Sequence, residues 1–232
     1  MKYVGSKDNI ARHILDMIYR RRKAGQVWVE PFVGGGNMID KVGGKRLGAD
    51  INPRVIEALT SIRDHLHELP KNNQEFTERD YKRVQLNKVH KHVGYIGFAL
   101  SYGGKWFGGY CRDGKGKRDY IEEAYKNAVI QNKKLQGIEL VCAPYDKLEI
   151  PDNSLIYCDP PYKGTTKYTH EFFHNRFYDW CRAKAKEGHT VCVSETTAPA
   201  DFICLWRMQR AASLTKNTGS ITCEEKLYIV KP

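Results

Sequence analysis

The sequence predicts an α/β fold in which a doubly wound, mainly parallel sheet carries the helices. Short apolar runs alternate with amphipathic stretches in the first and last parts of the chain, the pattern of strand–loop–helix units. Two of these runs end in a carboxylate, and the first leads into a glycine-rich turn. Such groups gather at the carboxyl edge of a parallel sheet, where these folds bind ligands. The 232 residues suffice for one large domain, or for one domain with an insertion.

The first predicted element is a helix, because Ile10, Ile14 and Ile18 recur at helical spacing and Gly25 follows as a stop. Residues 26–32 then read as a strand that runs into three consecutive glycines. A short helix is expected after these glycines.

A second strand is expected near 46–50, and it closes on Asp50. Pro53 favours the first turn of the helix that follows, since its fixed φ suits that position. The side chains expected on the buried side of this helix are Val55, Ile56, Leu59, Ile62 and Leu66.

The alternation of strands and helices stops between 70 and 137. In this segment, two helices are expected to flank the glycine-rich aromatic stretch 101–110. The elements predicted after the segment are strands at 138–142, 155–158, 190–194 and 226–230, and a helix over 171–186.

The charge is concentrated in the same middle segment. The chain has 38 Lys and Arg against 27 Asp and Glu, a net charge of +11. Basic residues that alternate with aromatic side chains are typical of a nucleic-acid-binding face, where cations gain affinity by releasing counterions from phosphates. A merely solvated basic surface is the alternative.

Cysteine usage and hydropathy indicate a cytoplasmic protein. The seven cysteines are scattered without a C-x-x-C pair, which favours reduced thiols over a disulfide framework. No apolar run reaches the roughly 18 residues of a membrane-spanning helix, and the start lacks the apolar stretch of a secretion signal.

Residues 157–162, Tyr-Cys-Asp-Pro-Pro-Tyr, form the most informative motif. Asp159 emerges at the carboxyl end of an apolar strand, and the two prolines lack N–H groups and leave carbonyls unpaired. Methyl transfer to the exocyclic amine of a nucleobase uses such a set, because the amine needs two acceptors and the extruded base needs a stacking partner. An X-Pro-Pro turn that only closes the strand is the alternative.

Residues 30–36, Glu-Pro-Phe-Val-Gly-Gly-Gly, form a second motif, in which glycines let a ligand lie against backbone amides. Ile39 stands where a dinucleotide fingerprint needs its last glycine, and no P-loop lysine follows. Asp50 can accept hydrogen bonds from both hydroxyls of a ribose. Its alternative role is to cap the next helix, which Asn52 could do instead. Together the loop and Asp50 favour S-adenosylmethionine over NAD.

In this order, the motifs resemble those of Dam-type (D12 class, alpha-group) adenine-N6-specific DNA methyltransferases. The segments that carry the resemblance are 3–7, 30–36, 50–52, 159–162 and 226–232. It covers nearly the whole chain, with a looser match in the middle. The resemblance implies a Rossmann-like sheet that binds S-adenosylmethionine, and methyl transfer to a flipped adenine in double-stranded DNA.

The resemblance also implies two parts: a methyltransferase domain over 1–69 and 138–232, and a small, mainly helical target-recognition insertion over 70–137. Spacing supports an insertion, because Gly36 lies 123 positions before Asp159. A compact sheet joins its first and fourth strands in about 65–75 residues. The residues expected to contact DNA are Lys105, Trp106, Tyr110, Arg112, Lys117 and Arg118.

Individual roles follow from the same resemblance. The Asp159 carboxylate and the Pro160 carbonyl would accept the hydrogens of the target amine, and Tyr162 would stack on the base. The residues implied to hold the cofactor are Tyr3, Lys7, Glu30, Phe32, Gly34, Gly35, Gly36, Asp50, Asp146 and Asp159. For Asp146, capping a turn is the alternative. Arg112 resembles an arginine that reads a base in some members, and contact with a phosphate is its alternative.

Residues 170–174, His-Glu-Phe-Phe-His, match the H-E-x-x-H zinc-protease pattern. A third ligand is not obvious, although Glu195 is a candidate. The segment is expected to begin a surface helix, whereas zinc-protease sites need a long helix in a cleft. We therefore expect no metal.

Other functions compatible with the motifs are methylation of an RNA base or a protein amide, and DNA binding without catalysis. We expect a protein of the bacterial cytoplasm, or of the host cytoplasm if a phage encodes it. A partner endonuclease, as in restriction–modification, is compatible with the sequence.

Overall fold

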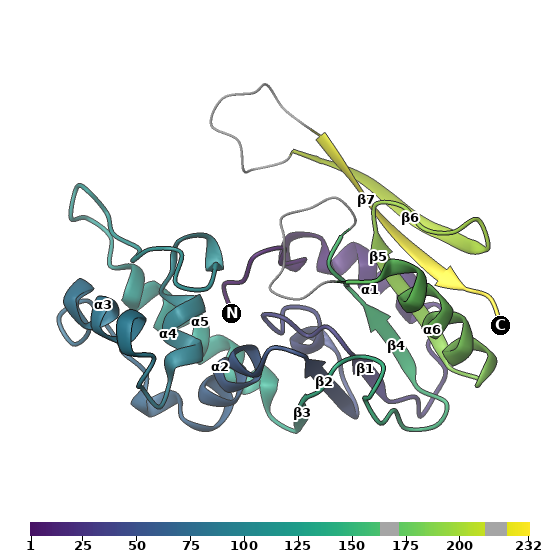
Figure 1. Cartoon of the computed structure of the whole chain (residues 1–232), viewed down its shortest axis with the longest axis horizontal. Helices are drawn as coiled ribbons and strands as arrows, with labels where there is room; N and C mark the ends of the chain where they lie inside the picture. The colour runs from purple at the N-terminus through teal and green to yellow at the C-terminus, as the bar shows by residue number, and fades with distance from the viewer. Residues whose placement is uncertain (163–171, 212–221) are drawn as a thin grey trace.

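The computed structural model describes residues 1–162, 172–211 and 222–232. Within these ranges, seven strands form one sheet in the order β3-β2-β1-β4-β5-β7-β6 (Figure 1). The strands are β1 (Trp28–Glu30), β2 (Arg46–Asp50), β3 (Ile138–Cys142), β4 (Leu155–Cys158), β5 (Thr190–Glu195), β6 (Phe202–Ala211) and β7 (Thr222–Val230).

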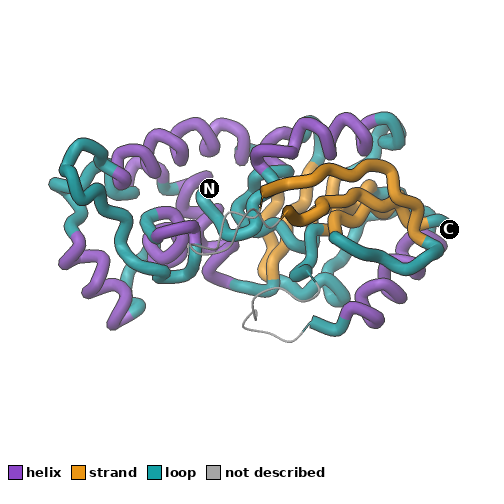
Figure 2. Tube along the Cα trace, turned by 90° about the horizontal axis from the view of Figure 1, so that it is seen from above, coloured by secondary structure: helices purple, strands orange, loops and turns teal. Residues whose placement is uncertain are grey.

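Helices lie on both sides of the strands (Figure 2). The helices are α1 (Ala11–Tyr19), α2 (Pro53–Asp64), α3 (Glu78–Asn87), α4 (Val93–Ala99), α5 (Tyr120–Leu135) and α6 (His174–Lys186). Apolar side chains of α1, α2, α4 and α5 join one buried cluster with one face of the sheet, and α6 packs into a second cluster on the other face. No helix in the described ranges is long and apolar enough to cross a membrane.

The doubly wound topology is confirmed. Strands β3, β2, β1, β4 and β5 run parallel, and β7 inserts antiparallel between β5 and β6. The chain proceeds from β1 outward to β2 and β3, then returns to β4 on the other side of β1. The strand order therefore reverses between β1 and β4, and the segments that follow these two strands flank the switch point where such sheets bind ligands.

Several predicted elements begin or end elsewhere. Strand β6 was not predicted, because its sequence lacks a clean alternation and its register shifts between Cys204 and Trp206. The last strand begins at Thr222 rather than at 226, and α6 begins at His174 rather than at 171. Leu66 lies beyond the end of α2 and is half-buried, since α2 ends at Asp64. The short helix expected after the glycines is a single 3-10 turn, Ile39–Lys41.

Between β2 and β3, the part of the chain around α3 and α4 lies beside the sheet, beyond β3 (Figure 1), while α2 and α5 pack with one face of the sheet. Helix α3 comes in addition to the two predicted helices. Thr77 starts it with a capping box, in which Thr77 and Asp80 satisfy each other's backbone N–H groups. Asp119 caps α5 by accepting from the N–H groups of Ile121 and Glu122. Because α5 packs into the core of the sheet and leads directly into β3, the boundaries of the insertion stay a prediction.

Candidate active site

Asp159 lies at the carboxyl end of β4, the strand next to the switch point. The four residues of β4 are fully buried between β1 and β5, so the next residue must emerge at the edge of the sheet. There Lys7 meets it: the ammonium Nζ lies 3.0 Å from Asp159 Oδ1, and the lysine side chain is only 5% exposed. Lys7 was predicted to border the cofactor, and the structure brings it onto the carboxylate of the Asp-Pro-Pro-Tyr motif.

Tyr162 completes a compact group around Lys7. Its hydroxyl donates to Glu225 Oε2 at 2.7 Å, and the Lys7 ammonium lies 4.4 Å from the centre of its ring. The same ammonium is 3.8 Å from Glu225 Oε2. We call Lys7, Asp159, Tyr162 and Glu225 the turn cluster. It joins the N-terminal segment, the Asp-Pro-Pro-Tyr turn and strand β7, which are distant in the sequence.

Burial dominates the electrostatics of the turn cluster. It raises the pKa of Asp159, while the Lys7 ammonium and the Tyr162 hydroxyl oppose the rise. Burial, together with the nearby carboxylates of Asp159 and Glu225, raises the pKa of Tyr162 well above its ordinary value. Tyr162 therefore stays a neutral donor at physiological pH, and Lys7 supplies the cation that favours ionised Asp159.

Asp50 connects the loops after β1 and β2. Its Oδ2 accepts from the Gly34 N–H at 3.1 Å, and its Oδ1 accepts from the Asn52 N–H at 2.9 Å. Asn52 caps α2, since its side chain accepts from the Arg54 N–H, so Asp50 is not needed for that role. Burial raises the pKa of Asp50 to about 6. Each carboxylate oxygen can accept a second hydrogen bond.

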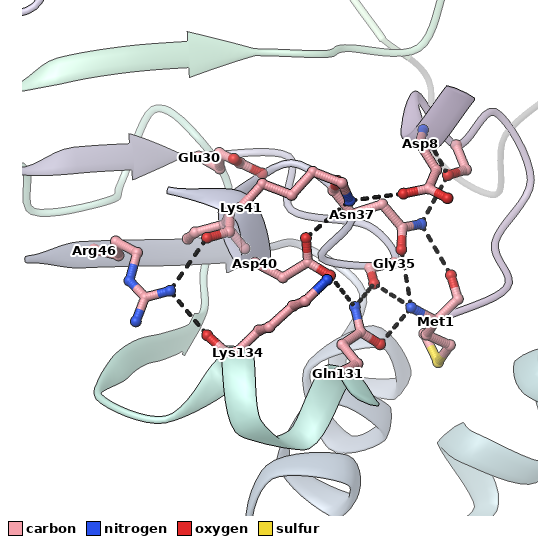
Figure 3. A network of polar contacts seen from close by, with 12 residues as sticks. Met1, Asp8, Glu30, Gly35, Asn37, Asp40, Lys41, Arg46, Gln131 and Lys134 are labelled. Carbon is pink, nitrogen blue, oxygen red and sulfur yellow. Dashed lines mark hydrogen bonds and ion pairs between the residues drawn. The ribbon is translucent and has the colours of Figure 1, made fainter. Parts of the chain in front are cut away.

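The N-terminal segment of the chain packs against the glycine loop and supports it. Figure 3 shows the Met1 amino group beside Gly35 and Asn37, and it donates to the Gly35 carbonyl at 2.9 Å. A β-carbon on Gly35 would lie 2.7 Å from the Met1 carbonyl oxygen and from Tyr3 Cβ. Tyr3 also packs its ring against Phe98 of α4, at 5.3 Å between centroids. Gly35 is thus required by the close approach of the N-terminal segment.

The other predicted cofactor residues lie along the same edge. Glu30 is buried at the end of β1 and accepts from Trp28 Nε1 at 2.7 Å, and burial raises its pKa well above the ordinary value. Gly36 ends the loop against the side chain of Leu59, which a β-carbon there would approach to 3.1 Å.

Phe32 belongs to an aromatic group at the start of α6. Its ring centroid lies 5.5 Å from that of Tyr145 and 5.6 Å from that of Phe177. Next to Tyr145, Asp146 is paired with Arg176 at 2.6 Å. The structure therefore brings the loops after β1 and β3 together through aromatic contacts.

Predicted DNA contacts divide into two kinds. Trp106 packs on Phe98 at 4.9 Å, and Tyr110 packs on Tyr81 at 5.6 Å, so both contribute to the core of the insertion. The basic residues Lys105, Arg112, Lys117 and Arg118 are exposed. Two of them are engaged by acids, as Arg112 lies 3.4 Å from Glu78 and Arg118 lies 2.8 Å from Glu123.

The H-E-x-x-H segment is only partly visible, since His170 and Glu171 lie outside the described residues. His174 Nε2 is 3.1 Å from the carbonyl oxygen of Pro161 and 3.9 Å from Glu195 Oε2. Among the residues that the structure describes, no group of three or more His, Cys, Asp or Glu side chains could hold a metal ion.

With this geometry established, comparison with known proteins gives a family. A family model described as D12 class N6 adenine-specific DNA methyltransferase matches residues 3–203. The chain belongs to this family. The D12 class is therefore confirmed as the family that the motifs predicted.

Relatives of this D12 class chain include the DNA adenine methylases of two Vibrio cholerae serotype O1 strains, Classical Ogawa 395 and El Tor Inaba N16961. Each is 28% identical over 183 residues, which cover 70% of this chain and 64% of the relative. A similar solved structure is the crystal structure of SMU.472, a methyltransferase by its description, complexed with SAH. It is 10% identical, with a TM-score of 0.37, and the match covers 97% of this chain and 52% of that one.

The sequence did not predict that Glu225 and His174 lie at this site of the D12 class chain. Glu225 lies on β7, two positions before the buried Leu227 and on the same face of the strand. An acidic residue in that register is the signal that could have revealed it. His174 was noticed only as part of a zinc pattern, and nothing in the sequence connects it with Pro161.

Proposed function

We propose that this chain transfers a methyl group from S-adenosylmethionine to N6 of an adenine in double-stranded DNA. The observation that carries the proposal is the turn cluster: Asp159 is held by Lys7 at 3.0 Å and Tyr162 by Glu225 at 2.7 Å, at the switch point of the sheet. Membership in the D12 class supports both the adenine and the DNA. The Vibrio cholerae relatives, named DNA adenine methylases, support the same substrate.

The residues present fit S-adenosylmethionine. Both oxygens of Asp50 accept one backbone N–H each and retain a lone pair, so the carboxylate could also accept from both hydroxyls of a ribose. Phe32 and Tyr145 present aromatic surface at the same edge of the sheet, where the adenine ring of the cofactor could pack. When bound, the cofactor would supply an electrophilic sulfonium methyl for N6, with its sulfur as the leaving group.

Asp159 and Pro160 activate the target amine in the proposed mechanism. The amine is a poor nucleophile because its lone pair is delocalised into the purine ring. The Asp159 carboxylate and the Pro160 carbonyl accept its two hydrogens, which draws the nitrogen toward tetrahedral geometry. Within the described ranges, no hydrogen bond engages the Pro160 carbonyl, which leaves it available to the amine. The surplus proton of N6 leaves through the hydrogen bond to Asp159.

Tyr162 and Lys7 position the partners of this reaction. Tyr162 stacks on the extruded adenine, which offsets part of the few kcal/mol that unstacking the base costs. Lys7 engages Asp159 Oδ1 and keeps the carboxylate ionised in its buried setting. Holding the reacting groups aligned supplies much of the acceleration.

The proposal is tested by incubating the chain with tritiated S-adenosylmethionine and, in parallel, with unmethylated plasmid DNA, RNA and bulk protein. The wild type is expected to transfer tritium to DNA. The Asp159→Ala variant is expected to lose this transfer while its unfolding midpoint stays that of the wild type. Asp152→Ala is the matched control, because Asp152 is an exposed aspartate in the turn before β4.

Tritium in RNA or protein but not in DNA would show that DNA is not the substrate. Near-normal turnover by Asp159→Ala would overturn the mechanism. Methylation-sensitive sequencing of DNA from a host that expresses the chain then identifies the sequence context of the adenine.

A further inference from the structure

The Asp-Pro-Pro-Tyr turn has one torsion that its prolines leave open. The pyrrolidine rings fix φ of Pro160 and Pro161, and a residue that precedes a proline is confined in ψ, which applies to Asp159 and Pro160. Of the φ and ψ angles between the α-carbons of Asp159 and Tyr162, only ψ of Pro161 is neither fixed within a ring nor restricted by a following proline. This torsion sets both the direction of the Pro161 carbonyl and the position of the Tyr162 α-carbon.

His174 holds the carbonyl that this torsion turns. Its Nε2 lies 3.1 Å from the Pro161 oxygen. A carbonyl oxygen can only accept, so Nε2 carries the proton and donates it. In this state Nε2 has no lone pair for a metal, so the nitrogen that holds the turn is not available as a zinc ligand.

The imidazole is itself fixed from other elements. His174 is the first residue of α6, and this helix is anchored on the sheet by its buried Phe177 and Cys181. The ring of Phe172 packs against the imidazole at 5.0 Å between centroids. Glu195, buried at the end of β5, places Oε2 3.9 Å from His174 Nε2.

We infer that His174 is a positioning residue for the proposed reaction: by donating to the Pro161 carbonyl it fixes ψ of Pro161 and hence the place of the Tyr162 ring. Tyr162 is then held at both ends, through its backbone by His174 and through its hydroxyl by Glu225 at 2.7 Å. The inference rests on the proposed function, in which Tyr162 stacks on the target base.

Turnover of His174 variants of the 232-residue chain, measured with unmethylated plasmid DNA, tests the inference. His174→Ala is expected to lower kcat about 10- to 100-fold, the cost of misplacing a group by about 1 Å, with less than about 3-fold change in the affinity for S-adenosylmethionine. His174→Gln is expected to restore most of kcat, because its amide N–H reaches the position of Nε2. His174→Asn is too short and is expected to stay low, while His67→Ala replaces an exposed histidine as a control.

A structural readout separates this inference from the proposed function. With 3-fluorotyrosine in the chain, the fluorine resonance of Tyr162, assigned through Tyr162→Phe, is expected to shift in His174→Ala and His174→Asn and to return in His174→Gln. An unchanged resonance together with wild-type kcat in His174→Ala would overturn the inference, as would stoichiometric zinc that His174→Ala loses. If the wild type methylates no DNA, the proposed function fails and the fluorine resonance alone decides the role of His174. If His174→Ala does not fold, His174→Asn takes its place in both measurements.

Discussion

The ammonium of Lys7 lies 3.0 Å from Asp159 Oδ1, at a point where burial already raises the pKa of that carboxyl. The same ammonium lies 3.8 Å from Glu225 Oε2. A single buried lysine therefore contacts two carboxylates, which would otherwise repel each other in a poorly solvated site. The ionised state of Asp159, which the proposed mechanism requires, depends on a side chain from the N-terminal segment.

Lys7→Gln is expected to raise the pKa of Asp159 further, because the charge that opposes the effect of burial is gone. With a raised pKa, Asp159 becomes protonated at a higher pH than in the wild type as the solution is acidified. The acid limb of the kcat–pH profile should therefore move to higher pH, and turnover at pH 7 should fall about 10-fold or more, equivalent to ~1.4 kcal/mol. Profiles measured with saturating cofactor and plasmid DNA give the shift.

The matched variant Lys7→Arg keeps a positive charge near Asp159. Its acid limb should stay close to that of the wild type, even if the bulkier guanidinium lowers kcat at every pH. If the acid limbs of the kcat–pH profiles of Lys7→Gln and the wild type coincided, Lys7 would have no electrostatic effect on Asp159.

Asp50 is expected to cause a second pH dependence, in the binding of the cofactor rather than in turnover. Burial raises its pKa to about 6, and only the ionised carboxylate offers all of its acceptors to a ribose. The dissociation constant for S-adenosylhomocysteine should be flat above about pH 7 and rise as pH falls through 6, approaching tenfold per pH unit. Asp50→Asn should bind more weakly and without this rise, as titration calorimetry at several pH values can measure. A parallel rise in Asp50→Asn would assign the effect to another group.

The sequence predicts those site residues that lie at the carboxyl end of a strand. Asp50 ends β2 and Asp159 directly follows β4, and the end of a parallel strand fixes the edge at which such side chains emerge. Glu225 and His174 could not be found in this way. Their partners lie far away in the sequence and meet them only through the packing of β7 and α6 against the rest of the sheet.

Composition alone does not distinguish the two uses of an aromatic side chain in the predicted DNA surface. Basic and aromatic residues alternate through 101–118, but the structure turns Trp106 and Tyr110 inward, against Phe98 and Tyr81, while the basic side chains stay outside. An aromatic residue in a polar segment serves stacking or packing equally well, and only the fold decides between the two uses.

Glu30 is a buried acid whose ionisation opposes folding. Burial raises its pKa well above the ordinary value, so the folded state favours the protonated form. The stability that this contributes is fully present below the ordinary pKa of a glutamate and is lost as pH rises through the folded-state pKa. Glu30→Gln is neutral and can still accept from Trp28 Nε1. It should therefore exceed the wild type in unfolding free energy at pH 8 by ~1 kcal/mol or more, since burying an ionised carboxylate costs several kcal/mol.

Urea unfolding at pH 8 and pH 4.5 checks this expectation. The advantage of Glu30→Gln should shrink at the lower pH, where the wild-type carboxyl approaches neutrality in both states. Glu30→Ala should be less stable than either at both pH values, by about 2–4 kcal/mol, because it leaves a cavity and an unpaired Trp28 N–H. The same difference between Glu30→Gln and wild type at both pH values would contradict the buried-charge explanation.

Substitution of Gly104 tests the contact that joins the predicted insertion to the N-terminal segment. The φ of Gly104 is +65° and a β-carbon there would lie 2.6 Å from the Tyr3 backbone nitrogen. Gly103 has the same φ of +65°, but nothing lies within 4 Å of the corresponding position, so Gly103→Ala isolates the backbone cost. That cost is about 1–2 kcal/mol, and Gly104→Ala should lose a further ~1–3 kcal/mol in urea unfolding as Tyr3 is pushed away.

The difference between the two alanine variants should also appear in cofactor binding. Tyr3 is predicted to border the cofactor and packs directly on the glycine loop, where a β-carbon on Gly34 would lie 3.0 Å from its ring. Displacement of Tyr3 should therefore weaken the binding of S-adenosylhomocysteine in Gly104→Ala and leave it unchanged in Gly103→Ala. Equal stabilities and equal affinities would mean that the N-terminal segment adjusts freely, and that the insertion and the cofactor loop are not coupled through Tyr3.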